Sequence, residues 1–224
     1  MISVAIDGPS GAGKSTISKF IAKKFEFVHV DTGAIYRTLG IHVKTNGISP
    51  ADREGVCALL PDVNIAIKYI DGVQHMFLNR EDVTHLLREH IISKYASDVS
   101  AIPEVREFLL DMQRSLAESY NVVMDGRDIA TVVLPESDIK IFLTATPEAR
   151  AERRYKELLE KGQSVEFSDV LKDIKKRDFN DSNRDAAPLR PHENSVIVDT
   201  TELSIEESMD KISQIVEIKL NQGR

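Results

Sequence analysis

The chain has 224 residues, of which 42% are hydrophobic and 29% charged, and its formal net charge is −7. This balance excludes wholesale disorder and suits one α/β domain that buries roughly two-thirds to three-quarters of its unfolded surface. The negative charge argues against a general nucleic-acid binder. No apolar run approaches the roughly 18 residues of a membrane span, and the N-terminus lacks a signal-peptide pattern. With a single cysteine, Cys57, these features predict a cytoplasmic protein.

Short apolar strands alternate with helices along most of the chain. The expected strands are 2–6, 28–31, 122–125, 139–143 and 196–199. The expected helices are 15–25, a helix from about residue 34, about 85–100, 103–119, 147–162 and a helix from residue 204. This alternation predicts an α/β fold whose parallel sheet is flanked by helices in three layers.

The stretch from about residue 62 to 84 breaks the alternation. Two β-like runs flank Asp71-Gly72, a dipeptide typical of a two-residue hairpin turn. We therefore expect a small antiparallel insertion within the α/β domain. Near the C-terminus, Ser204 and Glu207 have the spacing of a capping box that begins the last helix.

The most specific motif is Gly-Pro-Ser-Gly-Ala-Gly-Lys-Ser over residues 8–15, a phosphate-binding loop between a strand and a helix. Its glycines let backbone amides approach phosphate oxygens, and the helix directs its positive end at the same anion. Lys14 would neutralise β- and γ-phosphate charge, and the Ser15 hydroxyl would hold Mg²⁺. A bare glycine-rich turn is the alternative interpretation. The residues expected to bind ATP are Gly8, Pro9, Ser10, Gly11, Ala12, Gly13, Lys14, Ser15 and Thr16.

Two motifs follow other strands and should therefore lie at the same edge of the sheet. Thr32 and Arg37 follow the second strand, and Asp125-Gly-Arg127-Asp128 ends the third. Arginine binds phosphate bidentately, Asp128 can accept a hydrogen bond from an amino group, and Asp125 can orient water on a metal. Alternatively, Arg37 is a surface residue and the Asp-Gly-Arg-Asp segment is a turn with an internal salt bridge.

Two further arginine groups come later in the chain. Arg150, Arg153 and Arg154 share one helical face and could form a mobile cover that reaches the transferring phosphoryl group. The alternative is a solvated helix surface with Glu–Arg pairs. The stretch from Arg177 to Arg184 is either part of the site or a charged helix end followed by a loop.

Taken in order, the motifs of this chain resemble those of the bacterial cytidylate kinases over nearly its whole length. The segments that carry the resemblance are AIDGPSGAGKST, VDTGAIYR, the hairpin insertion, VMDGRDIATVVLP, EARAERR, IKKRDFNDSNR and APL. The bacterial cytidylate kinases belong to the P-loop nucleoside monophosphate kinases. The resemblance implies Mg²⁺-dependent, direct in-line transfer of the γ-phosphoryl group of ATP to CMP or dCMP. It also implies one kinase domain over 1–224, a monophosphate-binding region at about 35–120 with the insertion at about 62–84, a lid at about 148–166, and a monomer. Where family members read Asp-x-Gly, this chain has Asp128-Ile-Ala130.

The resemblance also implies a role for each motif. The residues expected to bind CMP are Thr32, Arg37 and Arg127 at the phosphate, Ser97, Arg106 and Asp128 at the base, and Arg177, Asp181 and Arg184 on the ribose and lid side. The expected catalytic residues are Lys14, Arg127, Arg150, Arg153 and Arg154, and the expected metal site is Ser15 with Asp125 through water. Two alternatives stay open: another small P-loop kinase, and a non-catalytic nucleotide-binding switch.

Overall fold

The computed structural model describes residues 1–222, except for the side chain of His90. The chain divides into two compact units. The first unit holds residues 1–28 and the chain from residue 120 onward, and the second holds residues 29–119. Within the described residues, no helix is both long and apolar enough to cross a membrane.

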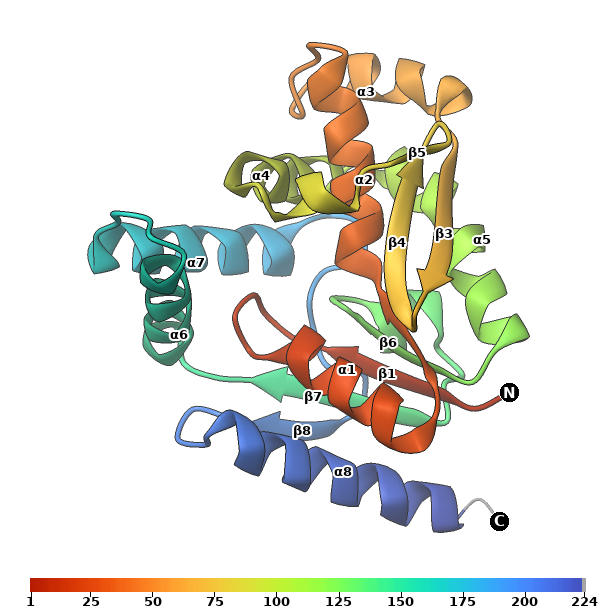
Figure 1. Cartoon of the computed structure of the whole chain (residues 1–224), viewed down its shortest axis with the longest axis vertical. Coiled ribbons are helices and arrows are strands. Elements are labelled where there is room, and N and C mark those ends of the chain that lie inside the picture. Colours follow the sequence, from red (N-terminus) through yellow and green to blue (C-terminus); the bar gives the residue numbers. More distant parts are fainter. Residues whose placement is uncertain (223–224) are drawn as a thin grey trace. The chain divides into compact units, whose positions relative to one another are not determined.

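The first unit is built on a sheet with the strand order β2-β6-β1-β7-β8 (Figure 1). Its strands are β1 (Ser3–Asp7), β2 (Val28–Asp31), β6 (Val122–Gly126), β7 (Ile139–Thr144) and β8 (Val196–Asp199). β1 pairs in parallel with both β6 and β7, and β7 pairs in parallel with β8. The unit boundary falls within β2, whose Val28 N–H donates to the carbonyl of Asn121. The predicted α/β fold with a parallel sheet is confirmed.

The α-helices described in the first unit are α1 (Lys14–Phe25), α6 (Pro147–Glu160), α7 (Phe167–Asn183) and α8 (Ile205–Gln222). α1 and α8 contact each other and join the sheet in one core, where Ile6, Ile17 and Ile212 are fully buried. The predicted capping box begins α8, since Ser204 and Glu207 each accept a hydrogen bond from the other's backbone N–H. α6 and α7 pack against each other around a small apolar core of their own.

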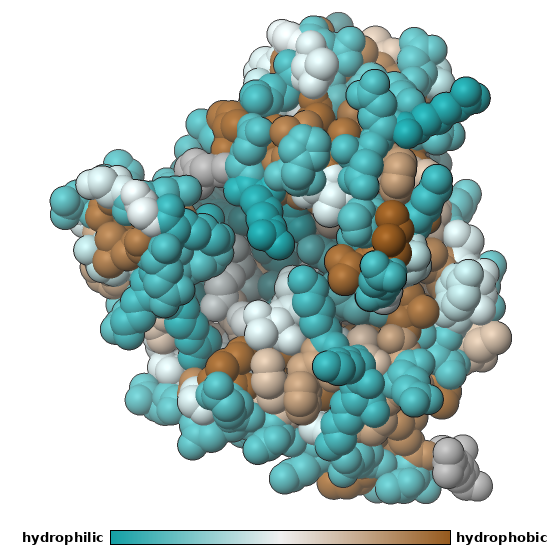
Figure 2. Space-filling view, viewed as in Figure 1, coloured by the Kyte–Doolittle hydropathy of each residue, from teal (hydrophilic) through white to brown (hydrophobic). Residues whose placement is uncertain are grey.

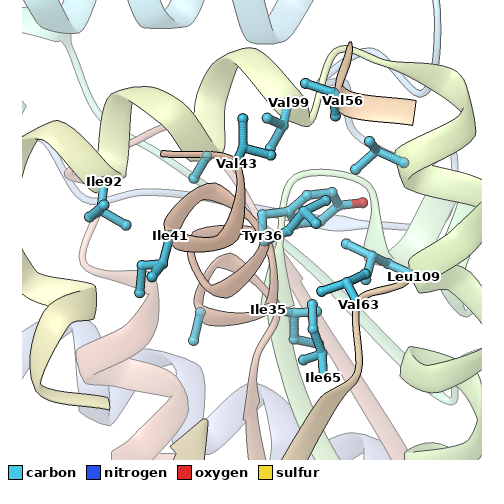
Figure 3. Close-up of a cluster of buried hydrophobic side chains, with 14 of the residues drawn as sticks. Ile35, Tyr36, Ile41, Val43, Val56, Val63, Ile65, Ile92, Val99 and Leu109 are labelled. Carbon is cyan, nitrogen blue, oxygen red and sulfur yellow. The ribbon is translucent and has the colours of Figure 1, made fainter. Parts of the chain in front are cut away.

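The second unit contains α2 (Thr32–Thr45), α3 (Arg53–Leu59), α4 (His90–Val99), α5 (Pro103–Ser119) and an antiparallel sheet of β3 (Ile65–Ile70), β4 (Val73–Leu78) and β5 (Glu81–Asp82). The predicted hairpin turn is present: Asp71 and Gly72 both have positive φ, at 51° and 74°. Figure 3 shows the core of this unit, where Ile35 of α2, Val99 of α4 and Leu109 of α5 are fully buried. On the face drawn in Figure 2, hydrophilic residues predominate.

Several boundaries differ from the sequence-based expectation. α2 begins at Thr32 rather than near residue 34, because the Asp31 carboxylate accepts the Ala34 N–H and caps the helix there. The expected helix over about 85–100 is interrupted at Glu89, whose backbone is extended; a 3₁₀ turn (Thr84–Arg88) precedes it and α4 follows. The polar stretch from Arg177 is helical as far as Asn183.

Candidate active site

The phosphate loop joins β1 to α1 in a conformation that its glycines make possible. A Cβ on Gly8 would lie 2.1 Å from the Leu143 carbonyl oxygen, so no other residue fits without a backbone shift. Gly13 precedes α1 in the left-handed region, with φ of 87°, and no side chain caps the helix. The first amides of α1 are therefore left to bind an anion, which the helix dipole also favours.

Lys14 is buried inside this loop, where 6% of its surface is exposed. Its Nζ donates to the carbonyl of Pro9 over 2.8 Å. Burial, together with the positive charges of Arg127 and Arg177, lowers the pKa of Lys14 well below its usual value, and nearby carboxylates only partly oppose this. The guanidiniums of Arg127 and Arg177 are therefore close enough to influence Lys14 beside the phosphate loop.

Ser15 and Asp125 place two oxygen ligands beside the loop. The Ser15 hydroxyl donates to Asp125 Oδ2 over 2.8 Å. Among the described residues, no group of three or more His, Cys, Asp or Glu side chains could hold a metal ion on its own. A hydroxyl and a carboxylate beside a phosphate loop do fit Mg²⁺, which uses one or two protein oxygens together with phosphates and water.

The turn that follows β6 lies against the end of α7. Arg127 Nε donates to Asp181 Oδ2 over 2.9 Å, and Arg184 Nη2 lies 3.5 Å from Asp128 Oδ1. Burial raises the pKa of Asp181, but the guanidiniums of Arg127 and Arg177 outweigh it and hold that pKa below the ordinary value. The segment around Arg127 and the end of α7, which lie far apart in the sequence, therefore form one network of alternating positive and negative side chains.

Asp7, the last residue of β1, is a structural residue of this site that no sequence motif singled out. Its carboxylate is 2% exposed and accepts the N–H groups of Ile129 and Ala130, each over 2.8 Å. Burial raises the pKa of Asp7 to about 6. These bonds hold the π-helical turn (Ile129–Val133) that follows Asp128, and they involve the Ala130 N–H at the position where family members have glycine. The one feature of the sequence that points to this role of Asp7 is its position, as an acidic residue at the end of an apolar strand.

Arg150 connects three parts of the first unit. It is 3% exposed, and its guanidinium donates to the carbonyls of Ala145 and Ser10 and, bidentately, to the Asp178 carboxylate over 2.9 and 2.6 Å. The carbonyl of Ser10 belongs to the phosphate loop and Asp178 to α7. Arg150 therefore links α6 to both.

The other two arginines of α6 point to different partners. Arg153 donates to the carbonyl and hydroxyl oxygens of Thr200 and lies 3.4 Å from the Leu203 carbonyl, between β8 and α8. Arg154 pairs with Glu157 on its own helix over 2.7 Å. In this structure the three side chains thus contact three separate sets of groups.

In the second unit, Thr32 and Arg37 lie in the first turns of α2. Thr32 is 3% exposed and is the first residue of the helix. Arg37 Nη2 lies 2.7 Å from Asp31 Oδ2. Burial raises the pKa of Asp31, yet the Arg37 guanidinium, His29 and the helix N–H together hold it below the ordinary value. An ionised Asp31 therefore orients Arg37.

Arg106 lies beside α2 in the same unit. Its Nη1 donates to the carbonyl of Ser100 over 3.0 Å, and its guanidinium lies 5.4 Å from the centre of the Tyr36 ring. Ser97, on α4, is half-buried, and its carbonyl accepts the Ser100 hydroxyl. The expected base-reading residues thus come from α4 and α5, with Asp128 in the first unit.

The candidate residues fall into two groups, one in each unit. The first unit contains the loop residues 8–16, Asp125, Arg127, Asp128, Arg150, Arg153, Arg154, Arg177, Asp181 and Arg184. The second unit contains Thr32, Arg37, Ser97 and Arg106.

Several known proteins with similar sequences are named as cytidylate kinases. The family model described as cytidylate kinase matches residues 4–218. A cytidylate kinase of Caldicellulosiruptor bescii is 52% identical over 214 residues, which cover 96% of this chain and 95% of that one. A cytidylate kinase of Clostridium tetani is 47% identical, with 96% and 93% covered. An uncharacterised protein of Eubacterium ventriosum shares the fold, with a TM-score of 0.52, 12% identity, and 97% and 99% of the two chains covered. The chain belongs to the cytidylate kinase family.

Proposed function

We propose that the protein transfers the γ-phosphoryl group of ATP to CMP or dCMP, giving ADP and CDP or dCDP. Membership of the cytidylate kinase family supports the reaction. The observation that carries the proposal is the buried Lys14 of the phosphate loop with two half-buried arginines, Arg127 and Arg177, close enough to affect its pKa. A second set of arginines next to a triphosphate site is suited to an anionic acceptor, which a non-catalytic nucleotide switch would not need.

On the donor side, residues 8–16 bind the phosphates of ATP through backbone amides and the N-terminus of α1. The Lys14 ammonium exchanges the Pro9 carbonyl for phosphate oxygens. Ser15 and Asp125, the latter through water, would hold Mg²⁺, which offsets β- and γ-phosphate charge when bound.

On the acceptor side, we assign Arg37, Arg127 and Thr32 to the phosphate of CMP. Asp128 would accept the cytosine N4 amino group, and Arg106 would donate to N3 and O2 with Ser97 beside it. Uracil carries a proton at N3, so two donors would face each other and UMP would bind poorly. The remaining residues of the network, on the ribose and lid side, are Arg177, Asp181 and Arg184.

The transfer itself requires no covalent enzyme intermediate and no strong general base, because an oxygen of the CMP phosphate attacks the γ-phosphorus in line. Lys14 and Arg127, with the lid residues Arg150, Arg153 and Arg154, stabilise the negative charge that develops. We assign the lid to about 148–166 and the monophosphate-binding region to about 35–120, including the insertion at about 62–84. The whole chain of 1–224 would act as a single kinase domain, a monomer in the reducing cytoplasm that one cysteine favours.

The test is ADP production from Mg·ATP with CMP, dCMP, UMP, AMP and GMP offered separately. The proposal predicts fast turnover with CMP or dCMP and much slower turnover with the other three nucleotides. Equal rates with UMP would contradict the assignment of base recognition. Turnover with none of the five would contradict the proposed reaction and favour another anionic acceptor or a switch.

A further inference from the structure

The antiparallel insertion contacts the end of β2 through two neighbouring side chains. Tyr69 and Gln74 lie directly opposite each other in the β3–β4 ladder, next to the hairpin turn. The Tyr69 hydroxyl donates to the carbonyl of His29 over 3.0 Å. The turn end of β4 lies beside the start of α2, which it contacts (Figure 1). The insertion thus touches the chain just before the helix that carries Thr32 and Arg37.

Gln74 pairs with the backbone of Asp31 in both directions. The Asp31 N–H donates to Gln74 Oε1 over 2.8 Å, and Gln74 Nε2 donates to the Asp31 carbonyl over 3.2 Å. The side-chain amide thereby imitates a neighbouring strand and satisfies both backbone groups of one residue. Nε2 also lies 3.1 Å from the sulfur of the buried Met76, which helps to fix the orientation of the amide.

The Asp31 carboxylate in turn binds two groups of α2. Its Oδ1 accepts the Ala34 N–H over 2.9 Å, and its Oδ2 accepts Arg37 Nη2 over 2.7 Å. The fit is tight, because a Cβ on Gly33 would lie 3.0 Å from Arg37 Nη1 and 3.1 Å from Asp31 Oδ1. A displacement of the Asp31 backbone therefore moves both the helix start and the guanidinium.

We propose that Gln74 is a positioning residue for the acceptor phosphate: it fixes the backbone of Asp31, and Asp31 in turn directs Arg37. This inference rests on the proposed function, in which Arg37 binds the phosphate of CMP. It gives the antiparallel insertion a mechanical role at that site. Because the proposed function assigns Arg37 to the acceptor alone, misplacing its guanidinium should weaken the binding of CMP and leave the binding of ATP nearly unchanged.

The test replaces Gln74 by methionine, which has a similar length but forms neither hydrogen bond with Asp31. We expect Gln74→Met to raise the KM for CMP about tenfold, the effect of losing one or two hydrogen bonds. The KM for ATP and the kcat at saturating CMP should change less than about twofold. The matched control is His75→Ala, on the same strand. The His75 side chain pairs with Asp82 and not with Asp31, so this variant should leave the KM for CMP unchanged.

A second comparison separates positioning from a general loss of structure. If Gln74 acts through Arg37, Gln74→Met should raise the dissociation constant of CMP in the wild-type background but add little in an Arg37→Ala background. Calorimetric titration with CMP measures this directly. Tyr69→Phe, which removes one hydrogen bond and keeps the ring, should give a smaller change in the same direction and serves if Gln74→Met does not fold.

The inference is overturned if Gln74→Met, or Tyr69→Phe in its place, leaves the KM for CMP unchanged or raises the KM for CMP and the KM for ATP equally. It is also overturned if Gln74→Met weakens CMP binding as much in the Arg37→Ala background as in the wild type. A wild-type protein that makes no ADP in response to CMP would instead overturn the proposed function. The two failures are therefore distinguishable.

Discussion

Replacing Asp7 by asparagine should remove a specific pH dependence from the folding stability of the protein. Burial raises the pKa of this carboxyl from 3.8 to about 6, because desolvation outweighs the two backbone N–H groups that favour the ionised form. The carboxyl is 2% exposed, so solvent screens it little. Its protonation state therefore contributes to the free energy of unfolding.

The sign follows from proton binding. Because the pKa is higher in the folded chain, the folded state binds the proton more tightly than the unfolded state does. The resulting stabilisation is fully present below pH 3.8 and is lost as the pH rises through about 6. The full shift corresponds to about 3 kcal/mol, of which about 1 kcal/mol should appear between about pH 7.5 and about pH 5.

Urea denaturation of the wild type and of Asp7→Asn at these two pH values measures the effect. We expect the free energy of unfolding of the wild type to rise by about 1 kcal/mol relative to the variant at the lower pH. Carboxyls with lowered pKa values, such as Asp181, are common to both proteins and cancel in the difference. Asp210→Asn, at an exposed position on α8, is the control. A difference that stays constant between the two pH values, or that shifts in favour of the variant at the lower pH, would refute the reasoning.

Three further substitutions test the site. Arg127→Ala should raise the KM for CMP by about 30- to 100-fold, because a charged hydrogen-bond donor is lost, and leave ATP affinity nearly unchanged; equal losses for both nucleotides in calorimetric titration would contradict its assigned role. Asp128→Ala should narrow the kcat/KM ratio of CMP over UMP about tenfold, and an unchanged ratio would remove it from base recognition. Arg150→Met should cost about 3–5 kcal/mol of stability by leaving Asp178 without its buried partner. Lys175→Met, which breaks an exposed ion pair between the same two helices, should cost at most about 1 kcal/mol, and an equal loss in both variants would contradict the distinction.

Local signals in the sequence predicted most of the fold. The strand over 28–31 has the bounds observed for β2, and the hairpin follows from Asp71-Gly72, since a two-residue turn of this kind requires positive φ at both positions. The interruption at Glu89 cannot be predicted locally, because neither proline nor glycine marks it. The early start of α2 is equally hidden, because Asp31 both ends a strand and caps the helix.

Those parts of the candidate site that consist of consecutive residues could be predicted from the sequence. The phosphate loop and the segment around Arg127 are two such parts. The pairing of Arg127 with Asp181 joins residues 54 positions apart, and Asp7 accepts hydrogen bonds from residues more than 120 positions away. Such contacts depend on how helices and turns pack, and no local pattern in the sequence encodes them. The role of Gln74 was hidden for the same reason, because half-buried strand residues carry no motif.

The most direct test of the central claim follows the phosphoryl group itself. The wild-type protein is incubated with Mg·ATP labelled at the γ-phosphate and with CMP, and the labelled products are separated. Direct transfer predicts that the label appears in CDP in step with ADP, with little label in inorganic phosphate. Label that accumulates in inorganic phosphate while CMP stays unchanged would contradict the account.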